Sequence, residues 1–284
     1  MVCAVIVGLI VLLVAAGTIV LVVQGKRQPS GEPLYVAMGS SFAAGIGLGD
    51  RAPDSPFACM RTINSYPAQL ASKLGLSLVD ATCSAATTTH ILNGGQYFQR
   101  PQLDAVTPAT KLVTITSGGN DVGYVGDLSA LAAREDGSLS GWLTGRLLGA
   151  PDLARPRDFG KVRRDLATVV QRIRQHAPEA RVVLVTYLNI LPPEGTCTAL
   201  NITAAEAGAM RKVGDEVAAA TRDAARDSGA LLVDMEHLGA AHNACSPEPW
   251  VNGWKDPQGT SFHPNLRGAQ AMAAAIAAAL VRNP

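Results

Sequence analysis

The sequence predicts a three-layer α/β/α fold, in which helices cover both faces of a central parallel sheet. Short β-rich runs alternate with helical patterns along most of the 284 residues, and the hydrophobic content of 48 % is enough for a large core. Strands that alternate with helices are typical of parallel sheets buried on both faces. With 24 Lys and Arg against 23 Asp and Glu, the balanced charge gives no reason to expect a nucleic-acid partner.

An apolar segment precedes this domain. No charged residue occurs between Val2 and Val23. At about 1.5 Å per residue, a helix of this length would span a hydrocarbon core of about 30 Å. Residues 1–23 are therefore interpreted as a transmembrane anchor or a signal segment. We expect a retained anchor because no A-x-A cleavage pattern precedes Gln24, and a cleaved signal peptide is the alternative.

The polar residues 24–33, rich in Gly and Pro, are expected to be a linker, so that the folded domain covers residues 34–284. Lys26 and Arg27 follow the apolar segment, and the positive-inside tendency alone would place the domain in the cytoplasm. The cysteines indicate the opposite side.

Four cysteines lie outside the apolar segment, at positions 59, 83, 197 and 245. None has C-x-x-C spacing, which argues against zinc. Of the three possible pairings, Cys59–Cys83 and Cys197–Cys245 are the most local, and four unrelated buried thiols are the alternative. Disulfides would indicate an oxidising compartment, so we expect the domain outside the cell, either anchored in the membrane or secreted.

Five β-rich runs are predicted as strands: residues 34–38, 78–82, 111–116, 181–187 and 230–234. Helices are predicted over residues 158–176, 203–228 and 265–282. In the first of these, apolar residues recur at spacings of three and four. The stretch 122–157 interrupts the alternation, and is interpreted either as a helical flap over a site or as a peripheral packing excursion.

Small polar residues follow the first three predicted strands. The sequences are Gly39-Ser40-Ser41, then CSAAT over residues 83–87, then SGGND over residues 117–121. In an open parallel sheet the functional groups gather beyond the carboxyl ends of the strands, so these three loops are expected to converge. A serine nucleophile needs a base within hydrogen-bond reach. His263, held in the stiff sequence His-Pro-Asn before the last helix, is the candidate.

The segments GSSFAAG, CSAATT, SGGND and SFHPN, in this order, resemble those of the SGNH hydrolases, also called GDSL-type lipases and esterases, and most of all the secreted, disulfide-containing bacterial branch. The resemblance extends from about residue 34 to the C-terminus. It implies a flavodoxin-like SGNH fold with Ser41 as nucleophile and His263 as base. It also implies an oxyanion hole from the N–H of Ser41, the N–H of Ala85 and the side chain of Asn120, with no metal or organic cofactor. Both local cysteine pairs match this branch.

Three positions depart from the family pattern. Ser40 stands where the family has Asp. Ala85 stands where the family has Gly, so its N–H is expected to remain an oxyanion donor only if the φ of Ala85 is negative. Thr260 stands where the family has the acid of the triad. We expect the backbone carbonyl of Thr260 to orient His263, and Asp256 is the alternative acid.

The predicted function is therefore the hydrolysis of carboxylic esters by a lipase or esterase. The expected partners are an ester or lipid substrate and a membrane contacted through residues 2–23. One alternative is an acyltransferase or deacylase that acts on a cell-envelope glycolipid or saccharide, and another is a catalytically impaired binding domain. The glycines of residues 45–49 lack the spacing of a nucleotide-binding loop.

Overall fold

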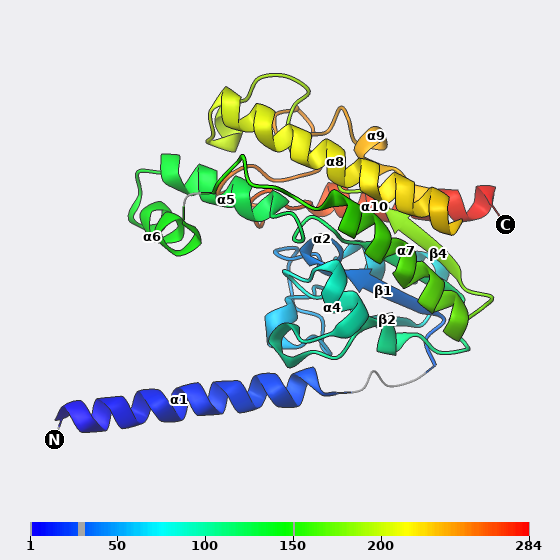
Figure 1. Ribbon diagram of the computed structural model, residues 1–284, viewed down its shortest axis with the longest axis horizontal. Helices are drawn as coiled ribbons and strands as arrows, with labels where there is room; N and C mark the ends of the chain where they lie inside the picture. The colour runs from blue at the N-terminus through cyan, green and yellow to red at the C-terminus, as the bar shows by residue number, and fades with distance from the viewer. Residues whose placement is uncertain (1, 28–31, 150, 284) are drawn as a thin grey trace.

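The computed structural model describes residues 2–27, 32–149 and 151–283, and it contains one five-stranded sheet (Figure 1). All neighbouring strands pair in parallel, in the order β2-β1-β3-β4-β5. The strands are β1 (Tyr35–Gly39), β2 (Leu78–Asp80), β3 (Leu112–Thr116), β4 (Arg181–Val185) and β5 (Leu231–Val233). Each strand lies inside a run predicted as a strand or extends one residue beyond it, and the expected α/β fold is confirmed.

Helices cover both faces of this sheet. On one face α3 (Tyr66–Leu74) packs against α10 (Leu266–Arg282), and on the other α4 (Thr88–Asn93) and α8 (Ala204–Ser228) pack against α7 (Phe159–His176). The chain moves in one direction across the sheet from β1 to β2 and in the opposite direction from β2 onward. Right-handed crossovers therefore place α3 on one face and the helices that follow β2, β3 and β4 on the other.

The core lies between these layers. All five residues of β1 and all five of β3 are buried, as expected for the central strands of a parallel sheet. Helix α7 buries Val162, Leu166 and Ile173 at the spacings that predicted it. Short helices complete the connections: α2 (Ser41–Ala44), α9 (Met235–Leu238), and the 3₁₀ turns η1 (Phe57–Cys59), η2 (Gln96–Phe98), η3 (Gln102–Ala105) and η4 (Thr198–Leu200).

The stretch 122–157 contains two helices of different character. Helix α5 (Tyr124–Glu135) belongs to the core, because Leu128 and Leu131 are buried. Helix α6 (Leu139–Leu148) follows a short turn and projects from the body as an arm, as Figure 1 shows. The stretch therefore combines a core helix with a projecting one, and a flap over the site stays a prediction.

Helix α1 (Val2–Gly25) extends away from the domain (Figure 1). Within the described residues it is the one helix long and apolar enough to cross a membrane, with a mean hydropathy of 3.1 over Ile6–Gly25. Its last turn is attached to the domain by two hydrogen bonds. The Phe57 N–H donates to Gln24 Oε1 at 2.9 Å, and the Arg100 N–H donates to the Gly25 carbonyl at 3.2 Å.

Candidate active site

The turn after β1 brings a serine to the start of a short helix. Gly39 has a φ of +135°, and a Cβ at this position would collide with the carbonyl of Thr116, so only glycine fits. Ser40 occupies the N-cap position of α2, and Ser41 is the first residue of that helix. The N–H of Ser41 lies in the first turn and has no hydrogen-bond partner in the described part of the chain. It is thus available to an anionic ligand.

Ser41 and His263 are in contact, although 222 residues separate them in the sequence. The Oγ of Ser41 lies 2.7 Å from Nε2 of His263. Both side chains are largely buried, with exposed fractions of 9 % and 8 %. This is the geometry in which an imidazole can take the proton of a serine hydroxyl.

The other ring nitrogen of His263 is held by a backbone carbonyl. Nδ1 donates to the carbonyl of Ser261 at 2.8 Å, which leaves Nε2 as the nitrogen that accepts from Ser41. The expectation that the carbonyl of Thr260 has this role is wrong for this structure. The Thr260 carbonyl instead accepts from Asn252 Nδ2 at 3.1 Å and from the N–H of His263.

The alternative acid, Asp256, is likewise not at Nδ1 of His263, since that nitrogen is bonded to Ser261. A carboxyl oxygen of Asp256 accepts from the N–H of Gln258 at 2.9 Å. Burial lowers the pKa of His263 to about 4, and the hydrogen bond to the Ser261 carbonyl opposes this effect. The imidazole is therefore neutral at neutral pH and can act as a base.

Ala85 has the backbone conformation that usually requires glycine. Its φ is +64°, so the condition of a negative φ set for this residue is not met. The alanine adopts the left-handed conformation at a cost of about 1–2 kcal/mol. Its N–H is therefore directed as it would be in a glycine with the same φ. Ala85 is exposed, and its N–H has no hydrogen-bond partner in the described residues.

Asn120 lies beside this loop. Its Nδ2 donates to the carbonyl of Ala86 at 2.9 Å, which fixes the orientation of the amide. The described residues provide no partner for the second N–H of that amide, and an oxyanion could accept it. The structure thus brings together Ser41 with His263, and Asn120 with the segment that contains Ala85.

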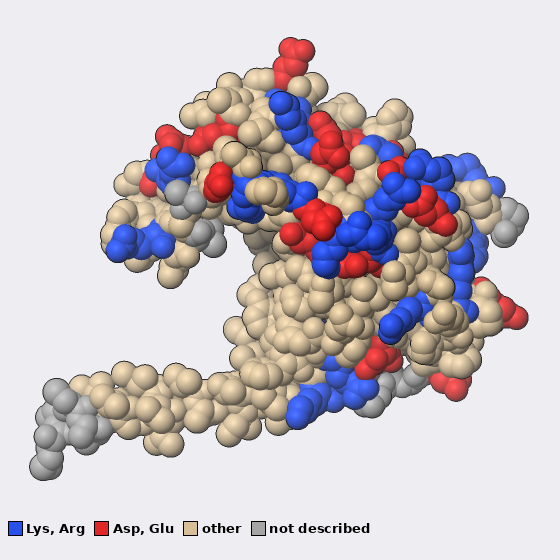
Figure 2. All heavy atoms as spheres, in the orientation of Figure 1, with Lys and Arg blue, Asp and Glu red and all other residues tan. Residues whose placement is uncertain are grey.

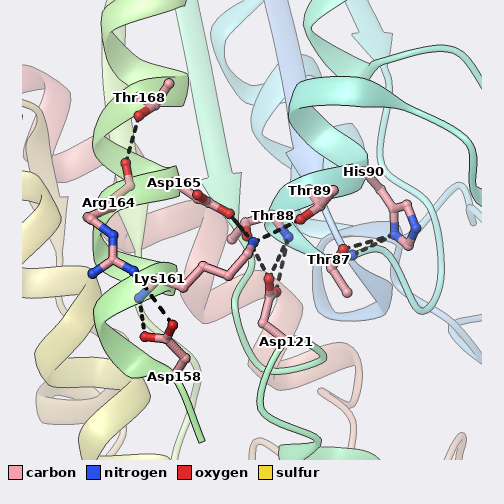
Figure 3. A network of polar contacts seen from close by, with 10 residues as sticks. All are labelled: Thr87, Thr88, Thr89, His90, Asp121, Asp158, Lys161, Arg164, Asp165 and Thr168. Atoms are coloured by element: carbon pink, nitrogen blue, oxygen red, sulfur yellow. Dashed lines mark hydrogen bonds and ion pairs between the residues drawn. The ribbon is translucent and has the colours of Figure 1, made fainter.

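A network of polar contacts joins the loop of Asn120 to helix α4, as Figure 3 shows. The carboxylate of Asp121 accepts from the Thr88 N–H at 3.0 Å and from its hydroxyl at 2.6 Å. The same hydroxyl lies 2.7 Å from Asp165, which is paired with Lys161. Burial raises the pKa of Asp121, and the hydrogen bonds from Thr88 oppose this. Because Asp121 follows Asn120 directly, this network fixes the position of the backbone at Asn120.

Two buried side chains that the sequence did not identify hold the turn of residues 39–41, which is called the nucleophile turn after the role expected of Ser41. Gln102 forms two hydrogen bonds with Gly39: its Oε1 accepts from the N–H at 2.7 Å, and its Nε2 donates to the carbonyl at 3.0 Å. The hydroxyl of Tyr187 lies 3.1 Å from Ser40 Oγ and accepts from the N–H of Gly119 at 3.1 Å. Tyr187 therefore links the nucleophile turn to the loop of Asn120.

Both expected disulfides are present. Cys59–Cys83 joins η1 to the loop after β2, and the N–H of Cys83 donates to the carbonyl of Gly39 at 3.0 Å. This bridge holds the loop that contains Ala85 next to the nucleophile turn. Cys197–Cys245 joins η4 to the segment after α9.

Comparison with known proteins assigns the family. Residues 37–271 match the GDSL-like Lipase/Acylhydrolase family. Lipase 2 of Streptomyces coelicolor is 31 % identical over 252 residues, which are 84 % of this chain and 83 % of that lipase. The chain belongs to the GDSL-like lipase/acylhydrolase family, and the expected class of carboxylic ester hydrolase is confirmed.

Solved structures agree with this assignment. An extracellular lipase from Streptomyces rimosus matches with a TM-score of 0.68 and 27 % identity, over 86 % of this chain and 98 % of that one. A phospholipase A1 from Streptomyces albidoflavus matches with a TM-score of 0.68 and 26 % identity, over 89 % of this chain and all of that one. The resemblance to SGNH hydrolases inferred from four short motifs is thus confirmed.

Proposed function

We propose that this enzyme hydrolyses the carboxylic esters of lipids, with Ser41 as nucleophile and His263 as general base. The observation that carries the proposal is the 2.7 Å contact between Ser41 Oγ and His263 Nε2. The carbonyl of Ser261 fixes the tautomer of His263 through Nδ1, in the place where a triad would have a carboxylate. The catalytic unit is therefore a dyad supported by a backbone carbonyl.

The reaction proceeds by acyl transfer through the enzyme. Ser41 Oγ attacks the ester carbonyl carbon while its proton passes to Nε2 of His263. The oxyanion accepts hydrogen bonds from the N–H groups of Ser41 and Ala85 and from the amide of Asn120. The ester C–O bond then breaks, and His263 returns the proton to the leaving alcohol. His263 next takes a proton from water as the water oxygen attacks the acyl carbon. The bond from that carbon to Ser41 Oγ then breaks, and His263 returns the proton to Ser41 Oγ as the carboxylic acid leaves.

The substrate class is supported by the relatives, which are named as lipases and a phospholipase A1. Lipid esters are held in membranes or aggregates, and α1 would keep the enzyme close to them. We propose that α1 anchors the chain and that the catalytic domain of residues 34–284 lies outside the cell. The two disulfides support this location. The linker expected over residues 24–33 is shorter than predicted, because Gln24 and Gly25 belong to α1, and its residues 28–31 lie outside the described residues.

The test compares wild type, Ser41→Ala and Ser40→Ala as full chains in detergent, on p-nitrophenyl esters of short and long acyl chains. Ser41→Ala is expected to lower kcat by about 10³-fold or more. Ser40→Ala removes the adjacent hydroxyl as a matched control. Because it also removes the hydrogen bond to Tyr187, we expect a several-fold loss, far smaller than that of Ser41→Ala. Equal loss in both variants, or none in Ser41→Ala, would contradict the assignment of the nucleophile. An added alcohol that is acylated faster than water would identify an acyltransferase instead.

A further inference from the structure

Helix α6 exposes a row of large apolar side chains. Leu139, Trp142, Leu143 and Leu147 are 74 %, 60 %, 48 % and 86 % exposed. Their spacings of three, four and eight residues place them on one face of the helix. The exposed Arg146 lies on the same face and is the one charged residue among them. Soluble surfaces expose single apolar residues often, but four large apolar side chains on one face, including a Trp, are typical of an interaction surface.

The opposite face of α6 explains why the apolar row points outward. Gly141 lies against Asp136, and Gly145 lies against Ala133, the two contacts being four residues apart along the helix. The small residues allow α6 to pack closely on the end of α5. In the 3.6-residue repeat, the three leucines lie on the far side from these glycines. Trp142, three residues before Gly145, lies at the edge of the row. The packing of α6 on the domain therefore uses its glycines and leaves the apolar row for another partner.

The base of α6 is connected to the loop that contains His263. Asp136, in the turn before α6, accepts from Trp254 Nε1 at 3.0 Å and is paired with Lys255. The ring of Trp254 stacks on Phe262, with centroids 6.0 Å apart. Phe262 directly precedes His263 in the sequence. The apolar row is thus joined, through the turn before α6, to the loop that contains His263, here called the catalytic loop.

Helix α1 and the residues beside it indicate that the partner is a lipid surface. Helix α1 is long and apolar enough to cross a bilayer, and its last turn is bonded to the backbone of Phe57 and Arg100. Phe57 and Phe98 beside it are 66 % and 50 % exposed. Tyr97, in the same 3₁₀ turn as Phe98, is 42 % exposed. A tyrosine at the end of a membrane helix is typical of the membrane–water interface. Figure 2 shows that the surface hollowed between the α6 arm and α1 is almost free of charge.

We infer that α6 is a lipid-docking helix: its apolar row inserts into the interfacial region of the bilayer and brings the catalytic loop to the esters held there. The partner is a lipid surface because the chain carries its own membrane helix, whereas a second copy or another protein would not require one. The inference rests on the proposed function in one respect, namely that the substrate is a lipid ester held in that surface. An amphipathic helix with Trp and Leu on its apolar face binds interfaces in this way.

The first test locates Trp142. The full chain is reconstituted into phosphatidylcholine vesicles with or without bromine on the acyl chains, and tryptophan emission is compared between wild type and Trp142→Phe. We expect brominated lipid to quench wild type, and most of that quenching to disappear in Trp142→Phe, which retains Trp250 and Trp254. Equal quenching in both proteins would overturn the inference, because Trp142 would then lie outside the bilayer.

The second test compares two matched double variants. Leu143→Ser with Leu147→Ser alters the row, whereas Leu238→Ser with Val281→Ser alters exposed apolar residues of α9 and α10 (51 % and 80 % exposed). The α6 variant should lose at least about tenfold in activity on vesicle esters but keep its activity on soluble p-nitrophenyl acetate. The control variant should keep both.

Unchanged vesicle activity in the α6 variant would overturn the inference. A dimeric wild type that becomes monomeric in the α6 variant, without quenching by brominated lipid, would also overturn it, because a second copy would then cover the row. An inactive wild type on the soluble ester would instead refute the proposed function, and the quenching of Trp142 would still decide the role of α6.

Discussion

At the residue scale, the environment of His263, the proposed base, decides the pH range in which we expect the enzyme to work. Burial lowers its pKa to about 4 from an ordinary value of 6.5. A base must be neutral to accept a proton, and a lowered pKa extends the neutral form to lower pH. We therefore expect kcat/KM on a soluble short-chain ester to be level from about pH 8 to about pH 5, and to fall with an apparent pKa near 4.

The measurement follows the released alcohol by chromatography, and circular dichroism at each pH verifies that the chain is folded. An apparent pKa at or above 6.5 would contradict the prediction. It would mean that a carboxylate stabilises the imidazolium in the free enzyme, and Asp256 would then be examined as that group by Asp256→Asn.

Sequence motifs identified Ser41 and His263, because each sits in a short segment of fixed local structure. The same reasoning selected the wrong carbonyl. Phe262 has a φ of +59°, and this turn presents the carbonyl of Ser261, not that of Thr260, to Nδ1. Carbonyls of consecutive residues point in different directions, and a backbone turn of this kind cannot be recognised from residue types.

At the element scale, three loops from different strands are held together by side chains from elsewhere. Tyr187, just after β4, is bonded to Ser40 in the first loop and Gly119 in the third. Its partner Ser40 is 147 residues away in the sequence, and Gln102 is 63 residues from Gly39. Such non-local pairs leave no periodic signal, so these two residues could not be predicted whereas the strands that end at the loops could.

We predict that Tyr187→Phe lowers both stability and kcat. Loss of the hydroxyl leaves the buried N–H of Gly119 without its partner, which should cost about 1–3 kcal/mol in the free energy of unfolding. Because Gly119 precedes Asn120, kcat should fall several-fold while KM changes little. Burial raises the pKa of Tyr187 to about 12, so its hydroxyl remains protonated over the working range.

Tyr66→Phe is the matched control for this prediction. Tyr66 is equally buried, and its hydroxyl lies 3.0 Å from Thr116 Oγ1 within the core. Denaturant unfolding and steady-state kinetics should show lower stability in both variants but a lower kcat only in Tyr187→Phe. A fall in kcat of the same size in Tyr66→Phe would reduce the role of Tyr187 to general stabilisation.

In the stretch 122–157, the sequence pattern predicts apolar helical faces but does not show which of them is buried. Leu128 and Leu131 of α5 are buried, whereas Leu143 and Leu147 of α6 are exposed, although both helices have leucines at helical spacing. Periodicity predicts that a helix has an apolar face, but it does not say what covers that face. The glycines of α6, which allow its other face to pack on α5, are the feature that decides it.

At the scale of the whole molecule, α1 and the disulfides together support the proposed location of the enzyme outside the cell. The disulfides require an oxidising compartment, and the window Ile6–Gly25 contains no charge to prevent membrane insertion. Lys26 and Arg27 alone would favour the opposite orientation. We give the two disulfides more weight in the proposal, because they hold the fold, including the loop beside the nucleophile turn.

We predict that α1 is retained as an anchor, because a helix with a mean hydropathy of 3.1 stays in the bilayer unless a peptidase removes it. Cells expressing the chain should yield it at its full mass of 29.5 kDa in the membrane fraction, resistant to alkaline extraction. Protease added to spheroplasts should degrade the domain, as its outer location requires. A shorter chain in the medium would show instead that α1 is a signal peptide, and α6 would then be the remaining membrane contact of the released enzyme.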